Sequence, residues 1–136
     1  MTIRSLASAG TCWLSVLSLG LVPLTAATAD PPGTYPDVIA VQVRAHGPDR
    51  FDFDVTVSSP YDTPQRYADG FRVGSLDGKV LHGERKLWHD HAGEQPFTRD
   101  LYGVSIPPGV RMVKVQARDQ RHGYGGRSME VTLPGR

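Results

Sequence analysis

An alternation of apolar and polar residues runs through most of this chain, and it limits the folds that the chain can adopt. The clearest case is the segment FDFDVTV at 51–57, where phenylalanines and valines alternate with aspartates and a threonine. Neighbouring side chains of a β-strand point to opposite faces, so one face of this segment is apolar and the other is wet. The pattern predicts a half-buried strand in an antiparallel sheet.

The same period of two recurs along the chain, and no segment after the first 36 residues shows a helical period. Turn-forming residues separate the runs: two prolines in SPYDTPQ at 59–65, the pair Asp77-Gly78, and Pro107-Pro108-Gly109. Gly103 is expected to form a β-bulge. We therefore predict an all-β fold, a seven-stranded antiparallel two-sheet sandwich, with a small barrel as the alternative. The expected strands lie at about 39–45, 51–57, 67–73, 79–88, 97–106, 113–117 and 129–133.

The N-terminal segment 1–29 reads as a signal peptide. Arg4 supplies the positive charge, the run CWLSVLSLGLVPL from Cys12 to Leu24 is apolar, and Ala27-Thr28-Ala29 fits a cleavage site before Asp30. The apolar run is too short for a membrane span. Cys12 lies inside this run and is preceded by Gly10-Thr11 instead of the Leu-small-small pattern that lipid attachment requires, so lipidation is not expected. We expect an exported protein, periplasmic or secreted and not inserted in the membrane, with a Pro-rich lead-in at 30–36 and the β-sandwich domain at 37–136.

The charge and cysteine content exclude several functions. The chain has 15 basic and 14 acidic residues, and Arg4 belongs to the expected signal peptide, so the remainder is close to neutral. Without a basic excess, binding to nucleic acid is not expected. The single cysteine, Cys12, also lies in the signal peptide, which leaves no thiol for a disulfide, a thiolate metal site or a cysteine nucleophile.

A histidine cluster is the most specific chemical signal. His89 and His91 are two positions apart and can point to one face of an extended segment, Glu94 follows closely, and His122 lies in a later loop. Imidazoles with a carboxylate are suitable ligands for zinc or copper, so these four residues form a candidate metal site. The competing interpretation is an ordinary polar loop, in which Arg99 pairs with Glu94 or Asp100.

Three aromatic residues near predicted turns, Trp88, Tyr124 and Tyr61, are candidates for binding a protein or a glycan. The alternative is that they cap the ends of the core. No G-x-S-x-G or H-E-x-x-H motif is present, and a small sandwich offers little concave volume, so we do not expect an enzyme.

The C-terminal third, LYGVSIPPGVRMVKVQARD followed by HGYGGRSMEVTLP, resembles the last three strands of fibronectin type III and related immunoglobulin-like domains. In that family a Pro-Gly turn and a V-x-V-x-A strand lead to a Gly-containing loop and a final alternating strand. The first half departs from the pattern, since no tryptophan occupies the second strand. The resemblance implies a sandwich architecture and no particular activity.

A second resemblance is to a group of small, exported, uncharacterised bacterial proteins. It rests on the block HDHAGEQPFTRDLYGVSIP, with YAD upstream and HGYGG downstream. It implies no function, but it indicates that these separate segments are parts of the same structural unit. Together the observations predict an exported, non-enzymatic β-sandwich that binds an unknown protein or glycan. The alternative is an envelope protein that binds copper or zinc through the histidine cluster.

Overall fold

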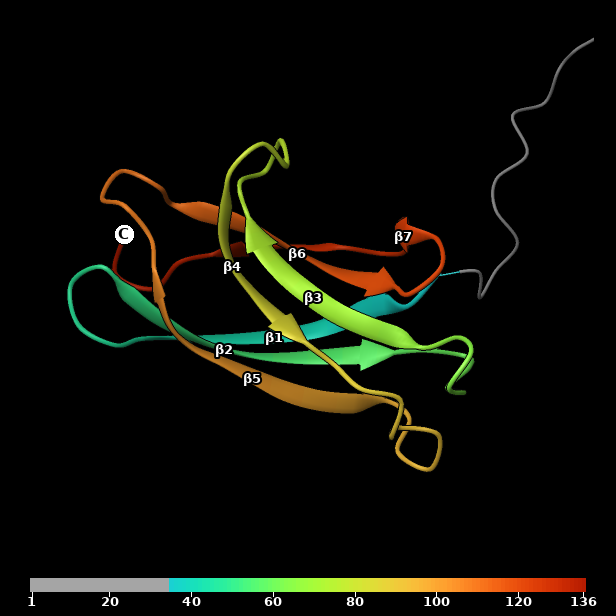
Figure 1. The fold of residues 1–136 in the computed structure, drawn as a ribbon. Helices are drawn as coiled ribbons and strands as arrows, with labels where there is room; N and C mark the ends of the chain where they lie inside the picture. The colour runs from blue at the N-terminus through green and yellow to red at the C-terminus, as the bar shows by residue number, and fades with distance from the viewer. Residues whose placement is uncertain (1–34) are drawn as a thin grey trace, which may run out of the picture.

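The computed structural model describes residues 35–136, which form two antiparallel β-sheets (Figure 1). No helix occurs among these residues, which confirms the predicted all-β class. The expected signal peptide and most of the Pro-rich lead-in lie outside the described residues. Within the described part of the chain, no helix could span a membrane.

The first sheet has the strand order β1-β2-β5, with β1 at Asp37–Ala45, β2 at Arg50–Ser58 and β5 at Phe97–Ser105. The second sheet has the order β4-β3-β6-β7, and β8 also pairs with β6. Its strands are β3 (Ala68–Gly74), β4 (Leu81–Lys86), β6 (Met112–Asp119), β7 (Gly123–Tyr124) and β8 (Met129–Thr132).

Eight strands are present where seven were expected. The additional strand, β7, is a two-residue pairing inside the segment HGYGG, which was predicted as a loop. Two close approaches explain the glycines that follow it: a Cβ on Gly125 would lie 2.5 Å from the Tyr35 ring, and one on Gly126 would lie 2.0 Å from the Pro36 carbonyl oxygen. Side chains at these positions would push the loop off the start of β1.

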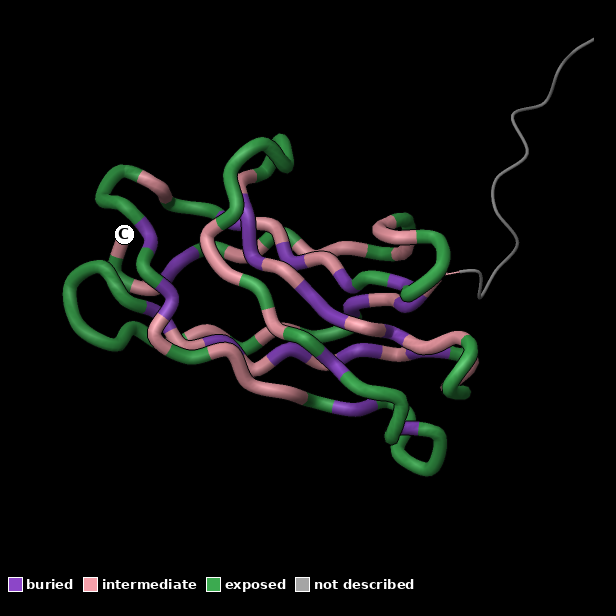
Figure 2. The backbone as a smooth tube through the Cα atoms, in the orientation of Figure 1, coloured by how far each residue is buried: buried purple, intermediate pink, exposed green. Residues whose placement is uncertain are grey.

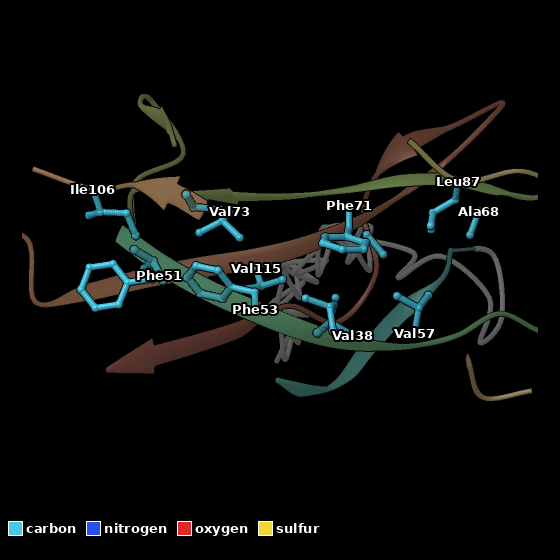
Figure 3. Packing of buried hydrophobic residues seen from close by; sticks show 14 of the residues in the cluster. Val38, Phe51, Phe53, Val57, Ala68, Phe71, Val73, Leu87, Ile106 and Val115 are labelled. Carbon is cyan, nitrogen blue, oxygen red and sulfur yellow. The ribbon is translucent and has the colours of Figure 1, made fainter. Parts of the chain in front are cut away.

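The core lies between the sheets and is built by the alternation seen in the sequence. In β2 the inward residues Phe51, Phe53, Val55 and Val57 are all buried, whereas the residues between them are partly exposed. Figure 3 shows side chains from both sheets packed against one another, and Figure 2 shows buried positions along the strands and exposed ones in the connections. Removing this apolar surface from water is the main stabilising contribution.

The bulge expected at Gly103 is present. The β2–β5 register shifts between Phe51 and Phe53, and Gly103 has a φ of +68°. Residues other than glycine rarely adopt this backbone conformation. The Gly103 amide donates to Asp52 Oδ1 at 2.8 Å, so the extra residue keeps a hydrogen-bond partner. The turn at Asp77-Gly78 is also confirmed as the link between β3 and β4.

Candidate functional site

Three connections lie at the same end of the sandwich: residues 59–67 before β3, residues 87–96 after β4, and the segment around β7 (Figure 1). These connections contain all the residues that the sequence marks as candidate metal ligands or partner contacts. The structure therefore brings the candidates to one end, as expected for loops of a sandwich, and their individual contacts decide what each can do.

His91 is a structural residue of the 87–96 connection. Its side chain is almost completely buried, and its ring stacks on Phe97 with 4.0 Å between ring centroids. Arg99 Nη2 lies 3.0 Å from His91 Nδ1 and also binds Glu94 Oε2 at 3.1 Å. Because a guanidinium can only donate, Nδ1 accepts, and the neutral ring carries its proton on Nε2.

The backbone of this connection is held just as closely. The His91 amide donates to Asp62 Oδ2, and Gln95 Oε1 accepts from the Ser59 amide at 2.9 Å. Gln95 Nε2 in turn donates to the His91 carbonyl at 3.3 Å. Much of the block HDHAGEQPFTR thus holds its own connection against the one before β3. We call this block, residues 89–99, the histidine lock.

Two buried atoms of the histidine lock region lack a hydrogen-bond partner among the described residues: His91 Nε2 and Asp62 Oδ1. Nε2 lies 3.1 Å from Asp90 Oδ1, but without the geometry of a hydrogen bond.

The predicted metal ligands are not assembled into one site. His89 packs edge-on against Tyr67 and His122 edge-on against Tyr35, whereas His91 stacks on Phe97. The Arg99 guanidinium lies between His91 and Glu94, and it lowers the pKa of Glu94 through a hydrogen bond and its charge. Within residues 35–136, no three His, Cys, Asp or Glu side chains lie together in a way that could hold a metal ion.

Tyr61 belongs to a network inside the same end of the sandwich. Its hydroxyl donates to Asp119, whose side chain is fully buried, and the Arg66 guanidinium lies 3.8 Å above the Tyr61 ring. Asp119 also accepts from Arg66 Nε and from the amides of Arg121 and His122. Burial alone would raise the pKa of Asp119, but these donors lower it below its ordinary value. Tyr61 therefore holds the connection before β3 onto β6.

Trp88 and Tyr124 differ from Tyr61, because Tyr124 lines a hollow on the outer face of the second sheet and Trp88 contacts Lys86, another residue of that lining. Trp88 is 60% exposed, and Lys86 Nζ lies 4.3 Å from the centre of its ring. Tyr124 is half-buried, with the Arg72 guanidinium 3.8 Å above its ring. Tyr124 and Lys86 line the hollow, which has a volume of about 350 Å³.

The register of the strands explains why the surface is hollow there. Gly70 on β3 is opposite Lys86 on β4 and Arg118 on β6, and Arg118 is opposite Tyr124 on β7. These four residues form one row across the sheet and face the same side. Gly70 has no side chain to fill the middle of the row. A Cβ there would lie 2.8 Å from the Arg85 carbonyl oxygen, so the glycine also permits close pairing with β4.

Charged side chains surround this glycine. Asp69 lies at a register shift between Ala68 and Gly70, and its Oδ2 accepts from Arg118 Nη1 at 3.1 Å. Burial raises the pKa of Asp69, and the charge of Arg118 offsets part of this. Its Oδ1 is buried and has no hydrogen-bond partner among the described residues.

Two further residues complete the charged part of the lining. Glu84 lies one row away from Gly70, opposite Arg72. Arg85 reaches instead toward β5, where it binds the Asp100 carboxylate at 3.1 Å and its carbonyl at 2.9 Å.

Sequence reasoning identified Tyr124 and Trp88 but missed Asp69, Gly70 and Arg118. A signal was present, because Asp69 ends the motif YAD and Tyr124 lies in HGYGG, the two segments that accompany the histidine block. Their meeting at one hollow depends on which strands pair, and spacing along the chain does not reveal that.

Comparison with known proteins gives few relatives. No protein-family model matches the chain. Over 95 residues it is 38% identical to a protein of Halomicrobium mukohataei named "Putative lipoprotein", and this alignment covers 70% of the chain and 46% of that protein. The chain thus spans about half the length of this relative. Among solved structures, a hypothetical protein of Pyrococcus horikoshii OT3 is similar with a TM-score of 0.46 and 15% sequence identity, over 73% of this chain and 85% of that one.

Proposed function

We propose that residues 35–136 form a non-enzymatic binding module that recognises a protein or glycan ligand through the hollow over Gly70. One observation carries this proposal: a hollow of about 350 Å³ has Tyr124 and Lys86 in its lining, and Lys86 contacts the exposed Trp88. Ligand sites in proteins are concave, combine aromatic with a few polar groups, and start at about 300 Å³.

We propose no catalysis at the hollow, because several of its charged side chains are engaged in ion pairs. Asp69 is paired with Arg118, and Arg85 is paired with Asp100. The lining includes no serine, threonine, cysteine or histidine, and of its two carboxylates Asp69 is held in an ion pair with Arg118, so Glu84 has no free carboxylate beside it to share the roles of acid and base. A ligand bound there should remain chemically intact.

We also propose that the protein is exported and belongs to the cell envelope. The apolar segment at 12–24 and the cleavage pattern before Asp30 support this, as does the name of the Halomicrobium relative. Intact-mass analysis of the exported protein tests whether the signal peptide is cleaved before Asp30. A chain that begins at Asp30 supports signal cleavage, whereas a lipid mass on Cys12 would contradict it.

The fold of this module is proposed to be of the fibronectin type III kind. The fourth strand, β4, pairs with β3 in the sheet of β6, whereas in constant immunoglobulin domains the fourth strand joins the sheet of the first two. The strand order therefore supports the fibronectin type III arrangement, with β7 and β8 together in the place of the last strand.

The experiment is a binding screen of the purified full chain against a glycan array and an extract of envelope proteins, with Tyr124→Ala as the test variant. Tyr102→Ala is the matched control, because Tyr102 is an exposed aromatic residue on the other sheet. We expect a ligand whose binding is lost in Tyr124→Ala and retained in Tyr102→Ala. Ligands that bind both variants equally well would contradict a role for the hollow, and degradation of a bound glycan would contradict a non-enzymatic function.

A further inference from the structure

Three basic and two acidic side chains line the hollow, and a third carboxylate, Asp100 on β5, is paired with the basic Arg85, so the charges of the two signs offset one another. Of the side chains that line it, Asp69 and Glu84 are acidic and Lys86 and Arg118 are basic, while Arg85 is paired with Asp100 on β5. An anionic ligand would approach Asp69 and Glu84, and a cationic ligand would approach Lys86 and Arg118, so either one meets like charges at close range. The balance favours a ligand without net charge.

The same side chains supply both donors and acceptors of hydrogen bonds. Arg118 uses Nη1 for Asp69, and its side chain is 48% exposed, so further N–H groups are available to a ligand. Lys86 contributes an ammonium group next to Gly70, and Glu84 contributes a carboxylate. A hydroxyl group both donates and accepts, so a ligand with several adjacent hydroxyls can bond to the two kinds of group at once.

Asp69 provides the most specific position. Its Oδ2 accepts from Arg118 Nη1, whereas Oδ1 is buried away from solvent, so the exposed 17% of this side chain does not include Oδ1. A carboxylate oxygen has two lone pairs, so Oδ2 can accept from a ligand hydroxyl in addition to Arg118. The Arg118–Asp69 pair thus presents an oriented donor and an oriented acceptor side by side.

Aromatic rings lie at both ends of the row that crosses the hollow. Tyr124 lines the hollow at the β7 end, and at the β4 end Lys86 contacts the ring of Trp88, which follows β4. Such rings offer flat apolar surfaces with little loss of conformational entropy, which suits the apolar C–H faces of a sugar ring. The polar centre and the aromatic borders therefore complement the two kinds of surface that one sugar carries.

We infer that the hollow over Gly70 binds a neutral saccharide, with Arg118 and Asp69 bonded to adjacent hydroxyls and Tyr124 and Trp88 beside its apolar faces. This inference rests on the proposed binding function and specifies its ligand class. A hollow of about 350 Å³ is at the small end of ligand sites, so one sugar unit of a longer chain is held.

The test is isothermal titration of the purified full chain with oligosaccharides of equal length but different charge. Maltohexaose, cellohexaose and mannohexaose are the neutral probes, hexagalacturonate is the anionic probe, and a glucosamine hexamer is the cationic probe. We expect at least one neutral probe to bind, with an affinity that changes little with salt concentration. Charged probes should bind at least about fivefold more weakly, as expected for one unfavourable contact of about 1 kcal/mol.

Two variants connect this binding to the hollow. Asp69→Asn removes the charged acceptor with little change of shape, and it should weaken binding of the neutral saccharide by about fivefold or more. Asp54→Asn is the matched control, since Asp54 is also paired with an arginine, Arg44, but lies on the outer face of the first sheet. The Asp54→Asn variant should bind the neutral saccharide with the same affinity as the unchanged protein.

The outcomes separate the ligand class from the binding function. If a charged probe binds more tightly than the neutral ones, and this binding is lost in Asp69→Asn or Tyr124→Ala, the hollow is a binding site but its ligand is not a neutral saccharide. If no oligosaccharide binds but a protein ligand is lost in Tyr124→Ala, the saccharide inference fails and the binding function stands. If nothing that binds depends on Tyr124, both fail.

Discussion

The histidine lock and the hollow over Gly70 use similar residues for opposite purposes. In the lock, His91, Glu94 and Arg99 bond mainly to one another and to the neighbouring connection. In the hollow, Asp69 and Arg118 are also paired, but the missing side chain at Gly70 leaves an open space beside the exposed part of Arg118. Both regions are rich in charge and aromatic rings and both contain buried polar atoms without a partner among the described residues, but only the second borders a hollow that a ligand can enter.

This difference shows that residue type alone does not identify a site. A histidine beside a carboxylate is a metal ligand only if no other group occupies the space between them, and in the lock Arg99 occupies it. A site requires unsatisfied groups around accessible volume, and here a glycine in the middle of a strand provides the volume. The comparison predicts that changes in the lock affect stability, whereas changes in the hollow affect binding.

The largest expected effect is in the lock. His91→Ala removes a buried ring stacked on Phe97 and one of the acceptors of Arg99, so we expect a loss of about 2–3 kcal/mol in the free energy of unfolding. Urea denaturation followed by the fluorescence of Trp88 measures it. His89→Ala is the control, because His89 is exposed and its ring packs edge-on against Tyr67, and it should change stability by less than about 0.5 kcal/mol. Equal effects of the two changes would mean that His91 is not the structural residue of the pair.

Asp119 should show the next largest effect, and one that depends on pH. Asp119→Asn removes a buried charge that accepts from Tyr61, Arg66 and two backbone amides, which should cost about 2 kcal/mol at pH 7. The pKa of Asp119 is lowered in the folded state, so its contribution is present above the unfolded pKa of about 3.9 and is lost as pH falls through the folded value. The gap between the two proteins should narrow below about pH 4, and a gap that stays constant down to pH 2 would contradict this.

Most of the fold could be predicted from the sequence, because alternation reports directly which residues face the core. The inward residues Phe51, Phe53, Val55 and Val57 of β2 are buried as expected, and Gly103 forms the expected bulge. The two-residue strand β7 could not be predicted in this way, because two residues are too short to show a period. It forms because the chain after β6 returns along the free edge of that strand.

The candidate site was less accessible to sequence reasoning. Tyr124 and Trp88 were found as aromatic residues near turns, but the hollow depends on Gly70 lying opposite Lys86 and Arg118. Pairing of β3 with both β4 and β6 is a long-range property of the fold. The pairing of Arg99 with Glu94 was foreseen as an alternative, yet the burial of His91 beneath it was not.

Changes in the hollow should have a small effect on stability. Lys86→Ala removes an ammonium group above the exposed Trp88 ring, a contact of about 0.5–1 kcal/mol at most, so we expect unfolding to shift by less than about 1 kcal/mol. The far-UV circular dichroism spectrum should not change. A loss as large as that of His91→Ala would show that the hollow is a structural element, and the contrast between the two regions would disappear.

The smallest expected effect is that of metal ions on the lock. Nδ1 of His91 faces the Arg99 guanidinium and its ring is buried, so a divalent cation would have to displace one cation and open a packed connection before it could bind. Calorimetric titration with Cu(II) or Zn(II) near pH 7 should therefore give no one-to-one binding that disappears in the double variant His89→Ala, His91→Ala. Micromolar binding that the double variant abolishes would mean that the lock opens in solution, and the histidines would then be metal ligands whose arrangement here is the closed form.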